Sequence, residues 1–336
     1  MPGRTWKDVE GSAQEKIKSY LLDNGGIQQE TKSPYEVWRV GFSDIVFTCY
    51  TSGKLYATPS NSNDPAVTKA WEFIDSIAGM PYAVPSKKFL IGLDETGKGE
   101  IIGHVILTGV IIPSEIFSEI DRLIGPADTK NRRSYEYWDG MFKKLDKMRN
   151  SGFDFIIEKI PPWDVDKYNL NKIMDLVYQR ILDKFSKKVS IGECRIVLDN
   201  YGTGAALRRF LYTLEEQGAE IVVTEKAEDK YLEAKAASLV SKRTREAVVK
   251  AINDNQEFQI DGLSVGSGNA GNKQTIEWLK KWHTAGKDWP WFIKKSFRTV
   301  RQIEGKTKKV LKSVPTIDES SHYVLSGERR RGRGEK

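Results

Sequence analysis

The sequence predicts an α/β protein in which a mixed sheet flanked by helices follows a small α+β domain. Short apolar strand patterns lie at 89–93 and 195–198, and a longer one lies at 101–112. Beyond residue 153, strand and helix patterns alternate, which is typical of a sheet with helices on its faces. The stretch before residue 80 instead combines a hairpin signal with two helix patterns.

The first domain, residues 1–80, is expected to pair two helices with a small sheet. Asn24-Gly25-Gly26 stops the first helix, Ser52-Gly53 turns between two strands, and Pro65 takes the first position of the second helix. The elements expected are a helix at 13–22, strands at 35–40, 44–50 and 54–58, and a helix at 65–78. Two prolines and a charged end make 81–88 a linker.

The second domain is expected at 89–312. Strands are predicted at 89–93, 101–112, 153–160, 195–198 and 219–224, and helices at 170–185, 205–217, 229–253 and 274–282. Residues 254–273 are rich in glycine and are expected to form a loop. The helical spacing of Trp278 and Trp282 favours packing in the core. The basic segment 313–336 is expected to be disordered.

Composition and charge narrow the range of partners. The chain has 336 residues, a formal net charge of +7 and a pI near 9.1, so it suits a polyanion, either nucleic acid or an acidic membrane surface. Cys49 and Cys194 form no metal-binding or disulfide pattern and are expected to be buried thiols. No stretch approaches the roughly 18 apolar residues of a membrane span, and no targeting signal is evident, so we expect a soluble, cytoplasmic monomer.

Acidic residues at strand ends carry the functional prediction. Asp94 and Glu95 follow one apolar strand pattern, Asp199 follows another, and Glu228 comes just before a helix pattern. Side chains at the carboxyl ends of strands converge in open α/β sheets. Four carboxylates would repel one another unless cations neutralised them, and two Mg²⁺ ions about 3.5–4 Å apart are the usual answer. Periodicity alone leaves open that Asp94 and Asp199 are ordinary polar residues at strand ends.

A more specific signal is the string Asp94-Glu95-Thr-Gly97-Lys98-Gly99, which resembles the opening DE-x-G-x-G motif of the type 2 RNase H family. This family includes RNase HII and RNase HIII. Further segments resemble the family in the same order, at 127–130, 197–199, 226–242, 266–277 and 294–297. Together these segments extend from about residue 89 to residue 300. Glutamate at position 228 and the presence of an N-terminal domain make the chain most similar to the RNase HIII branch.

The resemblance implies an RNase H-like catalytic fold and an endoribonuclease that hydrolyses the RNA strand of RNA/DNA hybrids, leaving 5′-phosphate and 3′-hydroxyl ends. It assigns two Mg²⁺ ions, with Mn²⁺ as an alternative, to four catalytic and metal-binding acids: Asp94, Glu95, Asp199 and Glu228. It also implies that residues 1–80, with Ser52-Gly53-Lys54 in a hairpin, form a TBP-like substrate-binding domain.

The same resemblance implies a set of substrate-binding residues. In the family, the backbone of the loop that corresponds to Gly97-Lys98-Gly99 reads ribose 2′-hydroxyls, which distinguishes RNA from DNA. The loop can also be a plain tight turn between two strands. Lys130 resembles a phosphate-contacting lysine, and a solvated surface lysine remains an alternative. Lys242 and Arg245 are expected to contact either the backbone of the hybrid or only solvent.

Two positions depart from the family pattern. Asn269 stands where RNase HII members have a tyrosine that supports cleavage at a single embedded ribonucleotide, so we expect weak or absent cleavage of that substrate. His104 replaces the proline that usually follows Gly103, and it is expected to be a packed strand residue. A non-catalytic hybrid-binding protein on the same fold is the main alternative, and a junction resolvase or integrase is a third.

Overall fold

The structure is a computed structural model that describes residues 3–7, 9–59, 64–78, 82–83, 85–124, 133–306 and 312–313. It divides into two units: residues 1–86 with 115–130 and 229–232, and residues 87–114 with 131–228 and 233–336. From the sequence, 115–130 were expected to belong to the second domain. Its described part, 115–124, groups with the first unit, where Asp121 accepts a hydrogen bond of 2.6 Å from Arg4, which also pairs with Asp75 at 3.0 Å.

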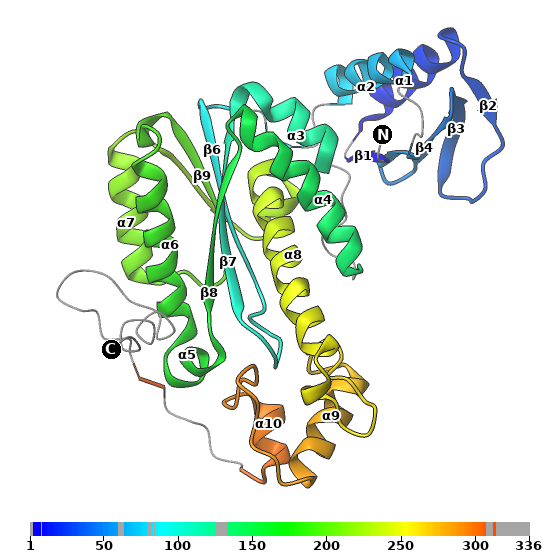
Figure 1. The fold of residues 1–336 in the computed structure, drawn as a ribbon. Coiled ribbons are helices and arrows are strands. Elements are labelled where there is room, and N and C mark those ends of the chain that lie inside the picture. The colour runs from blue at the N-terminus through cyan, green and yellow to red at the C-terminus, as the bar shows by residue number, and fades with distance from the viewer. Residues whose placement is uncertain are drawn as a thin grey trace. The chain divides into compact units, whose positions relative to one another are not determined.

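The first unit contains an antiparallel five-stranded sheet in the order β1-β5-β4-β3-β2 (Figure 1). Its strands are β1 (Arg4–Trp6), β2 (Ile27–Gln29), β3 (Glu36–Phe42), β4 (Ile45–Tyr50) and β5 (Leu55–Ala57). Its helices are α1 (Gly11–Asp23), α2 (Pro65–Ala78) and α3 (Phe117–Ile124). The strands β1 and β2, of three residues each, were not predicted, because so short a segment shows no alternation of apolar and polar residues.

Helices α1 and α2 cover one face of this sheet. Along β3, Trp38, Val40 and Phe42 are buried in the core that the two helices share with the sheet. Val37, which points to the opposite face, is 45% exposed, and Ile27 of β2 is 73% exposed. Within the part of the unit that the structure describes, the second face of the sheet therefore carries accessible apolar side chains.

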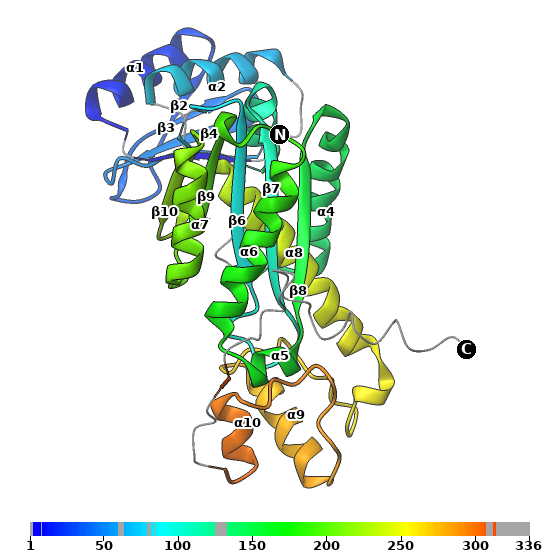
Figure 2. The same ribbon diagram turned by 90° about the vertical axis from the view of Figure 1, so that its left-hand side faces the viewer.

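The second unit contains a mixed five-stranded sheet in the order β10-β9-β6-β7-β8 (Figure 2). Its strands are β6 (Phe89–Thr96), β7 (Val105–Pro113), β8 (Asp154–Ile160), β9 (Cys194–Asp199) and β10 (Glu220–Thr224). The strands β6, β9 and β10 run parallel, whereas β7 is antiparallel to β6 and to β8. The predicted α/β class with a mixed sheet is confirmed.

Helices lie on both faces of the mixed sheet. Helices α6 (Leu170–Ser186) and α7 (Ala205–Glu216) cover one face, and α8 (Leu232–Asp254) runs across the other (Figures 1 and 2). The remaining helices of this unit are α4 (Tyr135–Lys147), α5 (Pro162–Lys167), α9 (Lys273–Thr284) and α10 (Arg298–Ile303). The 3₁₀ turns are η1 (Ser114–Ile116), η2 (Met148–Ser151), η3 (Ile191–Glu193), η4 (Ala227–Asp229) and η5 (Gln256–Phe258).

A second hydrophobic cluster joins the end of α8 to α9 and α10. Trp278 and Trp282 are buried in it, as predicted, and their rings stack at 4.7 Å. Ile101 and Ile102 belong to the same cluster. The predicted strand at 101–112 is therefore wrong in its first four residues, because they leave the sheet to pack here and Gly103 adopts a positive φ of 79°.

Cys49 and Cys194 are buried and unpaired, as predicted, and burial raises the pKa of each thiol to about 11. The described helices include none with both the length and the apolar character needed to cross a membrane.

Candidate active site

Asp94 and Asp199 lie side by side on neighbouring parallel strands. The pairing of β6 with β9 runs as far as Leu93 opposite Leu198, and an acid is the next residue on each strand. Neighbouring strands are about 4.8 Å apart, so the two acids start from adjacent backbone positions. Asp94 and Glu95 lie inside β6 and do not follow it, because the antiparallel pairing with β7 continues to Thr96.

Glu95 and Asp94 point to opposite faces of β6, as successive residues of a strand do. The hydroxyl of Tyr178, a fully buried residue of α6, donates a hydrogen bond of 3.3 Å to Glu95 Oε2. On the other face, the Ser238 hydroxyl of α8 and the Lys242 ammonium both act to lower the pKa of Asp94. Each of the two acids is thus held by a helix on its own side of the sheet.

Glu228 lies in η4, just before α8 as the sequence predicted. Ser238 Oγ donates to Glu228 Oε2 at 2.7 Å, and Lys242 Nζ lies 3.4 Å from the same oxygen. Lys242 Nζ also donates to Ser238 Oγ at 2.6 Å. Ser238 and Lys242 are one helical turn apart, so both reach the same carboxylate.

The raised pKa values of three acids have causes that link all four carboxylates in one chain of repulsions. Burial raises the pKa of Asp94 well above its usual value, and repulsion from Glu95 and then from Glu228 adds to this effect. Burial raises the pKa of Glu95 to about 7, with a further contribution from Asp199. Burial also raises the pKa of Asp199, and Glu228 adds repulsion. Each acid is therefore repelled by two others, as expected for one shared site.

The donor set fits divalent metal ions in its chemistry. Carboxylate oxygens are the ligands that Mg²⁺ and similar hard cations prefer, and such cations relieve the repulsion between buried acids. In the described part of the chain, no three Asp, Glu, His or Cys side chains are already arranged to hold one ion. The carboxylate of Glu95 instead contacts Tyr178, and that of Glu228 contacts Ser238 and Lys242.

The loop at 97–100 follows β6 directly. Gly97 has a positive φ of 89°, and a Cβ atom there would lie 2.5 Å from the carbonyl oxygen of His104, so the position requires glycine. Gly99 is exposed and has open space around it. The Lys98 ammonium donates a hydrogen bond of 2.8 Å to the carbonyl of Tyr201. Lys98 thus joins this loop to the segment that follows Asp199.

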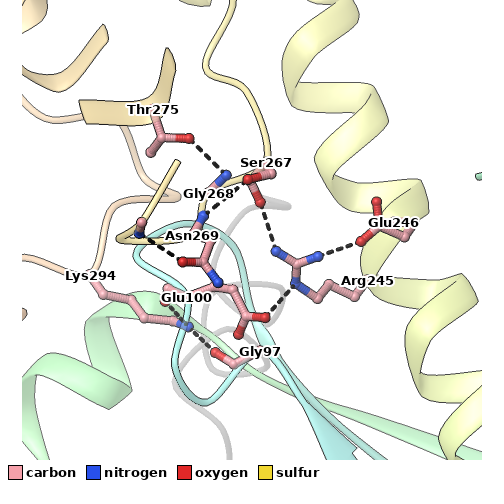
Figure 3. A network of polar contacts seen from close by, with 10 residues as sticks. Gly97, Glu100, Arg245, Glu246, Ser267, Gly268, Asn269, Thr275 and Lys294 are labelled. Atoms are coloured by element: carbon pink, nitrogen blue, oxygen red, sulfur yellow. Dashed lines mark hydrogen bonds and ion pairs between the residues drawn. The ribbon is translucent and has the colours of Figure 1, made fainter. Parts of the chain in front are cut away.

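Arg245 of α8 lies against the same loop and not on an open surface (Figure 3). Its guanidinium lies 3.7 Å from Glu100, donates to the carbonyl of Ser267 at 2.8 Å, and contacts Glu246. Asn269 is bridged to Glu100 in antiparallel fashion. The predicted site residues Arg245 and Asn269 are therefore both neighbours of Glu100.

Two residues of the site were not found from the sequence. Tyr178 belongs to an apolar helix stripe, which marks it only as a core residue. Lys294 is fully buried and donates hydrogen bonds to the carbonyls of Gly97 and Glu100 (Figure 3). It stands beside Lys295 in an irregular segment, where neither lysine carries a signal of burial. Lys130 and the residues after Ser313 lie outside the described residues.

Comparison with known proteins gives a consistent result. The family model described as ribonuclease HII matches residues 91–300. Ribonuclease HII of Aeropyrum pernix is 27% identical over 216 residues, which cover 64% of this chain and 90% of the relative. Ribonuclease HIII of Aquifex aeolicus is 26% identical over 198 residues, covering 57% and 68%. A crystal structure of Bst-RNase HIII in complex with Mn²⁺ shares the fold, with a TM-score of 0.52, 17% identity, and coverage of 90% of this chain and 98% of that chain.

Proposed function

Because the chain belongs to the ribonuclease HII family and is a ribonuclease H, we propose that it hydrolyses the RNA strand of RNA/DNA hybrids by two-metal-ion catalysis, leaving 5′-phosphate and 3′-hydroxyl ends. The observation that carries the proposal is the placement of Asp94 beside Asp199 on parallel strands, with raised pKa values that link four acids of the matched segment: Asp94, Glu95, Asp199 and Glu228. A cluster of buried, repelling carboxylates favours a site for divalent cations.

These four acids would hold two Mg²⁺ ions, with Mn²⁺ as the alternative that was found in Bst-RNase HIII. Such a pair of ions, when bound, activates a water molecule for in-line attack on a phosphodiester and stabilises the leaving oxygen. The protein groups around the acids then have a positioning role. Tyr178 orients the Glu95 carboxylate, and Ser238 orients that of Glu228. Lys242 supplies positive charge beside Glu228.

Recognition of RNA is assigned to the loop of Gly97, Lys98 and Gly99. Neither Lys98 nor Gly99 donates its backbone N–H to any other described residue, so both donors are available to a ribose 2′-hydroxyl. The side chain of Lys98 is bonded to Tyr201, which favours a structural role for it over a phosphate contact. Lys242 and Arg245 are likewise engaged by Glu228 and Glu100, so their contact with substrate remains a proposal.

The first unit is proposed to bind the hybrid, as a TBP-like domain would. Support comes from the second face of its sheet, where, among the described residues, Ile27 and Val37 are accessible and Arg39, which pairs with Glu36 at 3.6 Å, lies on the same side. Apolar and basic groups on one sheet face suit the sugars and phosphates of a duplex. This reading also fits the RNase HIII branch, to which Glu228 points.

Cleavage at a single embedded ribonucleotide is expected to be weak or absent. Asn269 pairs with Glu100, the residue that follows the recognition loop, and its side chain accepts a hydrogen bond of 2.8 Å from the Gly271 N–H. The amide offers no ring that could stack on a deoxyribose. Without that stacking contact, the loop would need ribose at successive positions of the bound strand to hold the substrate.

The proposal is tested by incubating the protein with Mg²⁺ and three labelled duplexes of one sequence: an RNA/DNA hybrid, a DNA duplex, and a DNA duplex with one ribonucleotide. Only the hybrid should be cut efficiently, with 5′-phosphate and 3′-hydroxyl ends, and EDTA should abolish cleavage. Asp94→Asn should bind the hybrid and not cut it. Asp261→Asn, at an acid that is 69% exposed, is the matched control and should cut normally.

Equal cutting of the DNA duplex would refute the assignment. Binding of the hybrid without cleavage by the unchanged protein would instead favour a non-catalytic hybrid-binding protein. Full activity of Asp94→Asn would remove the four-acid site from the mechanism.

A further inference from the structure

Lys294 is a fully buried lysine in the segment between α9 and α10, and the proposed chemistry does not use it. Burial lowers the pKa of its ammonium to about 7. Removing a lysine from water costs free energy unless its N–H groups find partners. Hydrophobic packing therefore does not explain why a lysine occupies this buried position.

The partners of Lys294 are two backbone carbonyls of the recognition loop. Its Nζ donates to the carbonyl of Gly97 and, at 2.8 Å, to that of Glu100 (Figure 3). These carbonyls flank Lys98 and Gly99, so one ammonium group closes the loop across its base. The Lys294 backbone is fixed as well, because its N–H donates to the carbonyl of Ile101 at 2.9 Å.

The loop is also held from its other side. Arg245 lies 3.7 Å from the Glu100 carboxylate and bonds the carbonyl of Ser267 at 2.8 Å. The N–H of Ile101 donates to the carbonyl of Gly268 at 2.7 Å. The segment that carries Asn269 is therefore joined to the same loop, and the two cations Lys294 and Arg245 contact it from different elements.

We infer that Lys294 is a positioning residue for RNA recognition: by drawing the Gly97 and Glu100 carbonyls inward, it keeps the N–H groups of Lys98 and Gly99 turned towards the ribose of the substrate. Carbonyl oxygens left at the loop surface would face the phosphates with partial negative charge and would repel them. The inference rests on the proposed function, because it assumes that this loop contacts the RNA strand.

The test measures preference for RNA in the full chain, carrying Asp94→Asn so that substrate is bound and not cut. Dissociation constants for an RNA/DNA hybrid and for a DNA duplex of the same sequence are compared by fluorescence anisotropy in Mg²⁺. Lys294→Met keeps the length of the side chain and removes the donors. Loss of one to two hydrogen bonds predicts an approximately tenfold fall in the hybrid-over-DNA affinity ratio, with DNA affinity unchanged.

Two further variants sharpen the comparison. Lys295→Met makes the same chemical change at the exposed neighbour and should keep the wild-type ratio. Lys294→Gln retains an N–H₂ donor on a shorter side chain and should give an intermediate ratio. Thermal unfolding of every variant is followed by circular dichroism, because a purely structural lysine would lower the melting temperature and weaken binding to both duplexes equally.

A wild-type affinity ratio in folded Lys294→Met overturns the inference. So does a parallel loss of affinity for both duplexes, or failure of both Lys294 variants to fold, because each outcome assigns the lysine to the fold alone. A starting protein with no preference for the hybrid and no cleavage of it would instead refute the proposed function, before any Lys294 variant is compared.

Discussion

The carbonyl oxygen of Glu233 lies 2.0 Å from the point where a Cβ atom at Gly92 would stand. The first turn of α8 therefore rests directly on the backbone of β6, two residues before Asp94. Only glycine permits this approach, because any side chain would have to displace the helix backbone. The contact sets the separation between the strand that carries Asp94 and the helix that carries Ser238.

Gly92→Ala should therefore destabilise the protein by about 2–3 kcal/mol or more, since overpacking here meets backbone atoms that cannot rotate away. Urea denaturation followed by circular dichroism measures the loss. Gly140→Ala is the control, because it lies in α4 with nothing within 4 Å of an added Cβ. That change should stabilise by about 0.5–1 kcal/mol. Equal stability of the two variants would contradict the close contact.

The ion pair of Arg195 and Glu233 joins β9 to the start of α8 in the interior. Its N–O distance is 2.8 Å, and the side chains are 2% and 0% exposed. Arg195→Met leaves a buried carboxylate without its partner and should cost about 3–5 kcal/mol in the free energy of unfolding. Lys281→Met breaks the exposed pairs with Asp261 and Glu277 and should cost about 1 kcal/mol or less. A small effect of Arg195→Met in urea denaturation would show that the pair is not needed.

The contacts of Lys242 point to a role that the sequence did not suggest, since the sequence indicated only a contact with the hybrid backbone or with solvent. Its bonds to Glu228 and Ser238 predict that Lys242→Met lowers kcat by about 10–100-fold, with little change in KM for the hybrid, because Lys242 would orient a proposed metal ligand. A phosphate contact would instead raise KM and reduce the salt dependence of binding. Steady-state kinetics at several salt concentrations decide between them. Lys250→Met, at an exposed pair on the same helix, should change neither constant.

His104 should make the protein less stable in mild acid. Its ring packs 5.3 Å from that of Trp291, its Nδ1 has no partner among the described residues, and burial lowers its pKa to about 4. The unfolded chain binds a proton near pH 6.5, so the neutral ring contributes stability above that pH, and this contribution is lost as the pH falls towards 4.

His104→Phe should then lose less stability than the wild type between about pH 7.5 and pH 5, by roughly 2 kcal/mol at most. Thermal unfolding at the two pH values measures the difference. The phenyl ring keeps the contact with Trp291 and cannot take up a proton. Identical pH dependence of the two proteins would mean that His104 is protonated in the folded state.

The acids and the glycine loop could be singled out as site candidates because their sequence signals are local. Asp94, Glu95 and Gly97 stand within four residues of one another after an apolar run, and Asp199 ends a second run. The extent of β6 could not be predicted, because its last three residues are polar and are kept in the strand by pairing with β7. The periodicity of a strand's own sequence does not show how far a neighbouring strand pairs with it.

Residues that act through distant contacts were beyond prediction. Lys294 reaches Gly97 across 197 positions of the chain, and nothing in its own segment distinguishes it from Lys295. Helix α4 was missed although its signal is present: Ser134 accepts a hydrogen bond from the Tyr137 N–H as an N-cap residue. Arg245 was identified as a candidate on α8. Its contact with Glu100 could not be predicted, because the two residues are far apart in sequence and meet only in the folded chain.

Helix α8 carries Ser238, Lys242 and Arg245 at intervals of four and three residues, so all three project from one side. Ser238 touches Glu228, an acid of the proposed active site, whereas Arg245 touches Glu100, beside the loop that is proposed to read the sugar, about 10 Å further along the axis. A continuous helix keeps this interval constant. On the proposed function, this helix fixes the number of nucleotides between the ribose that is sensed and the bond that is broken. One residue inserted between Ser238 and Arg245 would turn the two groups apart by about 100°.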